Sequence, residues 1–153
     1  MSNTYHQICY HIIFTTKNRQ SYFSKDIRNE IFNLIGAVIK EEGANSIIVG
    51  GHSEHVHLLV SIKPKYAISD FVAKIKSKTN HRLKERNLVS KDFEWQLGYG
   101  AFSFAKKDQE SLVEYIKNQE SHHQNVDFKE EFIAILKELN IDFDERYVVD
   151  ELK

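Results

Sequence analysis

The chain opens with an apolar run that is followed by apolar positions at helical spacing. Residues 5–16 are rich in β-branched and aromatic side chains and contain no Gly or Pro, so they predict a strand. Ser24 then offers an N-cap, and Gly43 suits the position after a helix end. The first unit is therefore a strand followed by a helix. The helical spacing between these two positions is carried by Ile27, Ile31, Leu34, Ile35 and Val38.

The pattern then predicts a hairpin and a second helix. Residues 46–49 and 55–62 are apolar runs of strand length, separated by a glycine pair at 50–51 that suits a turn. Residues 68–86 have the spacing of an amphipathic helix, with most of their basic side chains around the polar face. The apolar face of this helix carries Phe71, Val72, Ile75 and Leu83.

One more strand and two more helices complete the pattern. Residues 99–105 alternate as a strand, and residues 108–121 and 127–139 show helical spacing. The order is β-α-β-β-α-β followed by helices, which is the α+β, ferredoxin-like split βαβ arrangement with an antiparallel sheet and a C-terminal helical extension. We expect helices to cover one face of this sheet and to leave the other face available for a site.

Length and composition indicate one domain. A chain of 153 residues with 41% hydrophobic content builds one core, so we assign 1–153 to a single domain, with a core at about 5–121 and a C-terminal helix and tail at 122–153. The sequence holds no apolar stretch of membrane-spanning length and no secretory signal, so we expect a cytoplasmic protein without a membrane partner. The single cysteine, Cys9, is predicted to be a buried hydrophobe.

The net charge of −1 conceals an uneven distribution along the chain. Residues 63–86 carry eight basic residues against two acidic ones, whereas thirteen acidic and five basic residues follow from Asp108 onward. A polyanion such as DNA would be attracted to the predicted helix at 68–86, although a lysine-rich helix face is also common without any ligand. The candidate DNA-binding residues are Lys74, Lys76, Lys78, Arg82, Lys84 and Arg86.

Two histidines are predicted to share one face of a strand. Side chains alternate along a strand, so His55 and His57 point to one side while Val56 and Leu58 point to the other. Two imidazoles at this spacing can chelate one divalent metal ion. The chain contains eight histidines, however, so a pair of this kind also arises by chance.

A tyrosine and a glutamine lie one helical turn apart. Tyr115 and Gln119 stand beside the apolar stripe of the predicted helix at 108–121, where a side chain can leave the core and meet a site. The alternative is a half-buried tyrosine and a surface glutamine. In the same way, Tyr99, Phe102 and Phe104 either stack on unpaired bases or belong to the core.

Three segments, GGHSEHVHLLV, FEWQLGYGAFSFA and VEYIKNQESHH, resemble the single-tyrosine HUH transposases of small insertion sequences and their REP-associated relatives. The resemblance runs from about residue 5 to residue 121 and extends to the tail at 143–147. It implies that His55 and His57 bind metal, that Tyr115 is the nucleophile and that Gln119 completes the metal site. Ser53 and Glu54 depart from the usual pattern, in which relatives often carry Pro-Asp, and the role of Glu54 is left open.

The resemblance also implies an activity and a set of partners. Such an enzyme cleaves and rejoins single-stranded DNA at hairpin-bearing element ends, with a covalent 5′-phosphotyrosine intermediate and Mg²⁺ or Mn²⁺ as cofactor. An oxygen ligand and a phosphate substrate favour these ions over zinc. The family acts as homodimers that exchange the nucleophile helix, so that Tyr115 of one chain would serve His55 and His57 of the other.

Three other interpretations remain open at the level of sequence. A replication initiator or relaxase uses the same two histidines and a tyrosine. A non-catalytic nucleic-acid-binding module would leave the histidines on the surface and make Tyr115 structural. A zinc hydrolase would combine the histidines with an acid such as Glu54 or Glu120. His122 and His123, just beyond the tyrosine helix, are predicted to be surface residues.

Overall fold

The computed structural model describes residues 3–146 and residue 148. It contains a four-stranded antiparallel sheet in the order β2-β3-β1-β4. This order and the sequence of elements confirm the ferredoxin-like α+β fold. The strands are β1 (Cys9–Thr15), β2 (Asn45–Gly51), β3 (His55–Ser61) and β4 (Gly100–Ser103).

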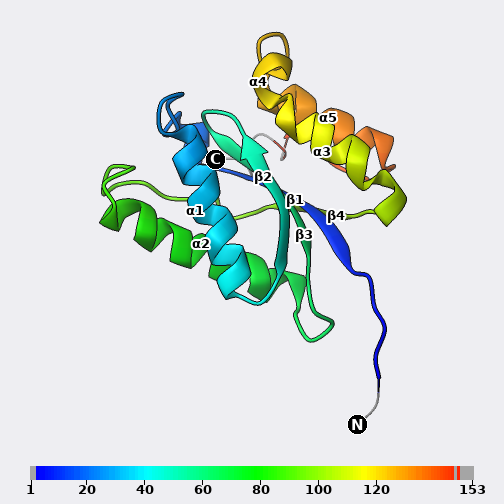
Figure 1. The fold of residues 1–153 in the computed structure, drawn as a ribbon. Coiled ribbons are helices and arrows are strands. Elements are labelled where there is room, and N and C mark those ends of the chain that lie inside the picture. The colour runs from blue at the N-terminus through cyan, green and yellow to red at the C-terminus, as the bar shows by residue number, and fades with distance from the viewer. Residues whose placement is uncertain (1–2, 147, 149–153) are drawn as a thin grey trace.

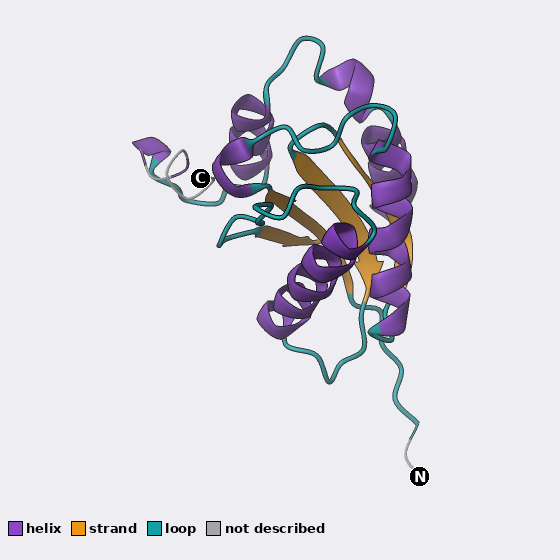
Figure 2. Ribbon diagram, turned by 90° about the vertical axis from the view of Figure 1, so that its left-hand side faces the viewer, coloured by secondary structure: helices purple, strands orange, loops and turns teal. Residues whose placement is uncertain are grey.

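Helices cover both faces of the sheet (Figures 1 and 2). On one face lie α1 (Arg28–Glu41) and α2 (Ile68–Glu85), and on the other lie α3 (Gln109–Lys117), the short α4 (Gln119–His122) and α5 (Phe128–Glu138). The expectation of one open sheet face is therefore wrong, because the C-terminal helices fold back over it. Among the described residues, no helix is both long and apolar enough to cross a membrane.

The core between the sheet and the α1–α2 layer confirms the predicted alternation of β3. Val56, Leu58 and Val60 are fully buried there, together with Ile12 and Phe14 of β1. The side chains that alternate with them, His55 and His57 included, therefore point to the opposite face.

A second, smaller core lies between the sheet and α5. Ile13 and Phe102 contribute from the strands, and Phe128 and Leu136 contribute from the helix. Phe102 is thus a core residue, 9% exposed. Cys9 is also buried, as predicted.

Several element boundaries differ from those predicted. β1 begins at Cys9 and not at residue 5, and the segment before it extends away from the sheet (Figure 1). The predicted N-cap at Ser24 is wrong, because α1 begins at Arg28 with Ile27 as its N-cap residue. The glycine pair at 50–51 belongs to β2, and the hairpin turn lies at 52–54.

The C-terminal boundaries were predicted more closely. The helix expected at 108–121 is interrupted at Asn118, which separates α3 from α4. The helix expected at 127–139 is present, and the side chain of Asp127 caps it by accepting from the backbone N–H of Glu130. Tyr147, at the end of the tail that carries the family resemblance, lies outside the described residues.

Candidate active site

The four residues predicted to form the site lie together on the α3–α5 side of the sheet. His55 and His57 are fully buried, and Gln119 is 1% exposed. Nε2 of His55 lies 2.9 Å from Oε1 of Gln119, and the ring of Tyr115 meets the ring of His57 edge to face, with centroids 5.8 Å apart. Tyr115 therefore reaches the histidines of its own chain.

A glycine allows α3 to approach the sheet closely enough to build this site. A Cβ atom added at Gly50 of β2 would lie 2.5 Å from Cγ2 of Ile116 and 3.2 Å from its carbonyl oxygen. Only glycine fits beneath the helix at this point. Ile116 is the neighbour of Tyr115, so the close contact at Gly50 sets the height of the nucleophile candidate above the strand.

Each histidine of the pair is oriented through its second nitrogen. Nδ1 of His55 lies 2.5 Å from Oε1 of Glu54, and Nδ1 of His57 lies 2.8 Å from Nε2 of His11. Burial alone would raise the pKa of Glu54, but the hydrogen bonds from His55 and Ser53, together with the nearby histidines, lower it to about 2. Burial and the neighbouring His57 lower the pKa of His11 to about 3. Both Nε2 atoms are thereby directed into the site.

Glu131 of α5 lies at the centre of the site, although no motif in the sequence predicted it there. It is 2% exposed, and its carboxylate accepts hydrogen bonds from the hydroxyl of Tyr115 and from the amide nitrogen of Gln119. Burial opposes its ionisation, but hydrogen bonds to His123 and His57 hold its pKa far below the ordinary value. Burial and the adjacent Glu131 carboxylate raise the pKa of Tyr115, so its phenol is protonated here.

The prediction that His122 and His123 are surface residues is wrong for His123, whose side chain is 4% exposed, whereas His122 is half-buried with its side chain 31% exposed. Nε2 of His123 lies 3.0 Å from Oε1 of Gln119 and 3.1 Å from Oε1 of Glu131. Nε2 of His122 lies 3.4 Å from the other oxygen of Glu131. The break between α3 and α4 turns both imidazoles toward α5. Both imidazoles therefore border the site beside Glu131.

The donor atoms fit a divalent cation. One ligand atom each from His55, His57 and Glu131 lie within 4.8 Å of one another, and the carboxamide oxygen of Gln119 lies beside them. Two imidazole nitrogens with oxygen donors suit Mn²⁺, and the oxygen donors suit Mg²⁺.

Neither acid expected for a zinc hydrolase faces this point. Glu54 contacts the Nδ1 atom of His55, on the side away from Gln119. Glu120 lies on the surface, where it pairs with Lys25 at 3.0 Å. The acid that does face both Nε2 atoms is Glu131.

Two of the residues missed in the sequence left a recognisable signal. Glu131 stands at helical spacing between the apolar residues Phe128 and Ile135, so it is an acid on the inward face of an amphipathic helix. His11 lies two residues before Ile13, which is the partner of His57 in the strand register. Its position becomes informative only once that register is known.

The candidate DNA-binding residues lie on or just after α2, across the sheet from the site (Figure 1). Several are already paired with acids at the C-terminal end of α1. Lys74 and Lys78 contact Glu42, and Arg82 contacts Glu41 at 2.5 Å. The structure therefore does not bring these residues together with His55, His57 or Tyr115.

Lys76 has a different environment from the other basic residues of α2. Its ammonium donates to the backbone carbonyls of Gln96 at 2.8 Å and Gly98 at 2.6 Å. Burial lowers its pKa to about 8. Lys76 thus ties α2 to the segment that leads into β4.

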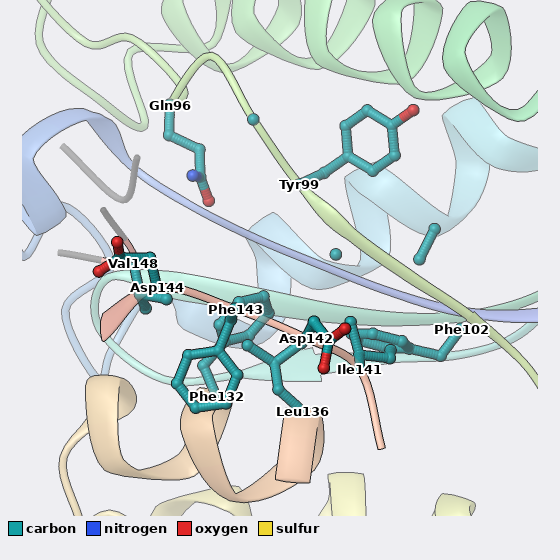
Figure 3. Close-up of a pocket in the computed structure, with 13 residues that line it drawn as sticks. Gln96, Tyr99, Phe102, Phe132, Leu136, Ile141, Asp142, Phe143, Asp144 and Val148 are labelled. Atoms are coloured by element: carbon teal, nitrogen blue, oxygen red, sulfur yellow. The ribbon is translucent and has the colours of Figure 1, made fainter. Parts of the chain in front are cut away.

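Two cavities flank β4. One, of about 660 Å³, opens beside the site and is lined by residues that include His11, Phe104, Tyr115 and Glu131. The other, of about 480 Å³, lies between β4, α5 and the C-terminal segment, and Figure 3 shows its lining. Among the residues labelled there, Phe132 and Leu136 of α5 lie beside Phe102 of β4, the ring of Tyr99 points away from them toward α2, and the acids are Asp142 and Asp144. The first cavity is the one that reaches Tyr115.

Comparison with known proteins gives consistent matches. The family model described as "Transposase IS200 like" matches residues 4–119. The chain is 26% identical to the ISDra2 transposase TnpA of Deinococcus radiodurans over 74% of this chain and 85% of that protein. It is 25% identical to the transposase for insertion sequence element IS200 of Salmonella typhimurium, over 72% of this chain and 75% of that protein.

Solved structures share the fold. A crystal structure of a Deinococcus radiodurans R1 protein matches with a TM-score of 0.62 and 20% identity, over 78% of this chain and 95% of that one. The structure of the REP-associated tyrosine transposase bound to a REP hairpin matches with a TM-score of 0.58 and 18% identity, over 82% of this chain and 76% of that one.

Proposed function

Because the chain belongs to the IS200-like transposase family, we propose that it cleaves and rejoins single-stranded DNA through a covalent bond to Tyr115. The observation that carries this proposal is the convergence of Tyr115 and Gln119 with His55 and His57. They come from segments far apart in sequence and meet in a buried site. A tyrosine with only a structural role would not need two histidines and a glutamine beside it.

The reaction exchanges one phosphodiester for another. The phenol oxygen of Tyr115 attacks the scissile phosphorus, the bond to the 3′ oxygen breaks, and a 5′-phosphotyrosine and a free 3′-hydroxyl result. A second 3′-hydroxyl reverses the attack and joins strands. The proton that the phenol loses is balanced by the proton that the departing 3′ oxygen takes up, and before the attack the phenol donates a hydrogen bond to Glu131.

The proposal includes Mg²⁺ or Mn²⁺ held by His55, His57 and Gln119. Such an ion would polarise the scissile phosphate and stabilise charge in the transition state. The chain itself orients the ligands, since Glu54 and His11 fix the imidazoles and leave both Nε2 atoms toward the bound ion.

The proposed substrate is single-stranded DNA that carries a hairpin. This is supported by the fold shared with a transposase whose structure contains a REP hairpin. The 660 Å³ cavity beside Tyr115 offers room for a nucleotide next to the scissile phosphate. The proposed backbone contacts of DNA beyond the site are Lys74, Lys76, Lys78, Arg82, Lys84 and Arg86 on or just after α2.

The family resemblance also leads us to propose a homodimer. One chain already brings Tyr115 to its own His57, and two chains that exchange α3 would build the same site from two polypeptides. Because the structure places Tyr115 beside His57 of its own chain, we propose that α3 is not exchanged within this homodimer.

The proposal is tested by incubating the protein with hairpin-containing single-stranded oligonucleotides from the flanks of its gene. We expect an SDS-stable protein–DNA adduct that requires Mn²⁺ or Mg²⁺ and disappears with EDTA. Tyr115→Phe should abolish it, whereas the control Tyr99→Phe, at a tyrosine outside the site, should retain it. Binding of the correct element ends without any adduct would instead indicate a non-catalytic nucleic-acid-binding module.

A further inference from the structure

Glu131 is an ionisable residue on the inward face of α5, which is otherwise apolar. It lies in α5, beyond residues 4–119 that match the family model, and its neighbours on the inward face of the helix include Phe128 and Leu136. A carboxylate buried to 2% exposure loses its hydration, and this loss must be offset by strong partners. The partners of Glu131 therefore indicate what the residue does.

The two oxygens of the Glu131 carboxylate face different groups. Oε1 lies 3.3 Å from Nε2 of His57 and 3.5 Å from Nε2 of His55. Oε2 accepts hydrogen bonds from the hydroxyl of Tyr115 and, at 2.8 Å, from the amide of Gln119. Oε1 thus faces the His55–His57 pair and also His123, and Oε2 faces the nucleophile and also His122.

The spacing of Oε1 from the histidines is that of ligands on one ion. Donor atoms bound to a cation at roughly 2.1 Å lie about 3 Å from one another in an octahedral arrangement. Neutral imidazoles and the carboxamide of Gln119 bring no charge to a divalent ion. Glu131 would therefore be the only anionic side chain among these four ligands.

We infer that Glu131 is a further ligand of the divalent cation through Oε1 and that its Oε2 positions the hydroxyl of Tyr115. This inference rests on the proposed function and adds to it a helix that lies outside the matched region. The same carboxylate then links the cation site to the nucleophile, so that α5 is part of the active site and not only a cover over the sheet.

The inference is tested by measuring Mn²⁺ binding to the full chain by isothermal titration calorimetry and electron paramagnetic resonance. Removing the charge in Glu131→Gln should weaken Mn²⁺ binding by roughly tenfold or more, the range seen when a metal site loses a supporting group. The matched control is Glu130→Gln, an exposed acid one residue away on the same helix, which should leave the affinity unchanged. Unchanged Mn²⁺ affinity in Glu131→Gln overturns the inference.

A second variant covers the case in which Glu131→Gln does not fold. Glu131→Asp keeps the charge but withdraws the oxygens by about one carbon–carbon bond, or roughly 1.5 Å. We expect weaker Mn²⁺ binding than in the parent protein. Equal affinity in a folded Glu131→Asp variant would mean that the carboxylate does not bind the ion.

The adduct assay, run on the same proteins, separates this inference from the proposed function. A parent protein that forms the adduct while Glu131→Gln binds Mn²⁺ normally refutes the ligand role alone. Faster adduct formation in Glu131→Gln also refutes the ligand role. It would mean that the Glu131 carboxylate occupies the position that the scissile phosphate needs. A parent protein with neither Mn²⁺ binding nor adduct refutes both.

Discussion

Oε1 of Glu54 lies 2.5 Å from Nδ1 of His55, and this contact directs the opposite nitrogen of the ring to Oε1 of Gln119. Glu54 is the last residue of the hairpin turn, where the sequence departs from the usual family pattern. Its carboxylate is held in place by the hydroxyl of Ser53, which donates to its other oxygen at 2.8 Å. The acid is therefore an orienting group for a metal ligand.

Glu54→Ala should reduce metal-dependent adduct formation by roughly ten- to a hundredfold, the usual effect of removing a partner of a ligating histidine. The protein should remain folded, because Glu54 lies at the edge of the hairpin. Adduct formation is measured against Mn²⁺ concentration, and the loss should be partly recovered at high Mn²⁺. Glu120→Gln, at the surface acid paired with Lys25, is the control. Equal loss in both variants would argue against the orienting role.

Mixing two inactive variants tests whether the nucleophile helix is exchanged. Because Tyr115 lies beside His57 of the same chain, we expect a mixture of Tyr115→Phe and His57→Ala to form no adduct. Exchange of α3 would place one intact Tyr115 against one intact pair of histidines in every mixed dimer, and an adduct would reappear. The mixture is denatured and refolded together before the assay, and size-exclusion chromatography with light scattering gives the number of chains.

Gly50→Ala should separate α3 from the sheet. The added methyl would meet Cγ2 of Ile116 at 2.5 Å, so either the helix or the strand must move. Overpacking of this kind costs about 1–3 kcal/mol of unfolding free energy. Displacement of the neighbouring Tyr115 should reduce adduct formation more than the loss of stability explains. Urea unfolding and the adduct assay give the two quantities.

Gly36→Ala is the matched control for this experiment. Its added methyl would have its nearest neighbour at 3.5 Å, an ordinary van der Waals contact, and Gly36 lies within α1. Replacing a helical glycine by alanine should stabilise the protein by up to about 1 kcal/mol. If Gly50→Ala behaved like Gly36→Ala, α3 would not be held against β2 in the active protein.

The fold and the shared strand face of His55 and His57 could be predicted from the sequence, because strand alternation is a local periodicity that a sequence carries directly. The prediction of one continuous helix through Tyr115 and Gln119 was wrong, because Asn118 separates α3 from α4. Glu131 reaches the site only because α5 folds back over the sheet, which depends on contacts between distant segments.

The position of the hairpin turn also depends on a contact between distant segments. A glycine pair suggests a turn, but Gly50 is needed for the close approach of Ile116, a contact that local sequence does not reveal. The strand therefore continues through Gly51 and turns at residues 52–54.

The basic residues of α2 should differ in their contribution to DNA binding. Lys84 and Arg86 form no ion pair within the described part of the chain, so their charges are available to phosphates. Lys84→Gln with Arg86→Gln should weaken binding to single-stranded DNA and lower the salt slope by about 0.7 for each phosphate that is no longer neutralised. Lys78→Gln, at a residue paired with Glu42, should have a smaller effect. Fluorescence anisotropy over a salt series measures both, and equal slopes in all proteins would place the DNA elsewhere.

Lys76 predicts a pH dependence of stability. Burial lowers its pKa from 10.5 to about 8, whereas the unfolded chain keeps the ordinary value. Between these two pH values the unfolded state binds a proton that the folded state has released, so the unfolding free energy rises with pH from about 8 toward 10.5. Lys76→Met removes this group, and its stability should lack that rise. Urea unfolding at pH 7.5, 8.5 and 9.5 compares the two proteins. Parallel pH profiles would show that Lys76 stays protonated while its ammonium bridges Gln96 and Gly98.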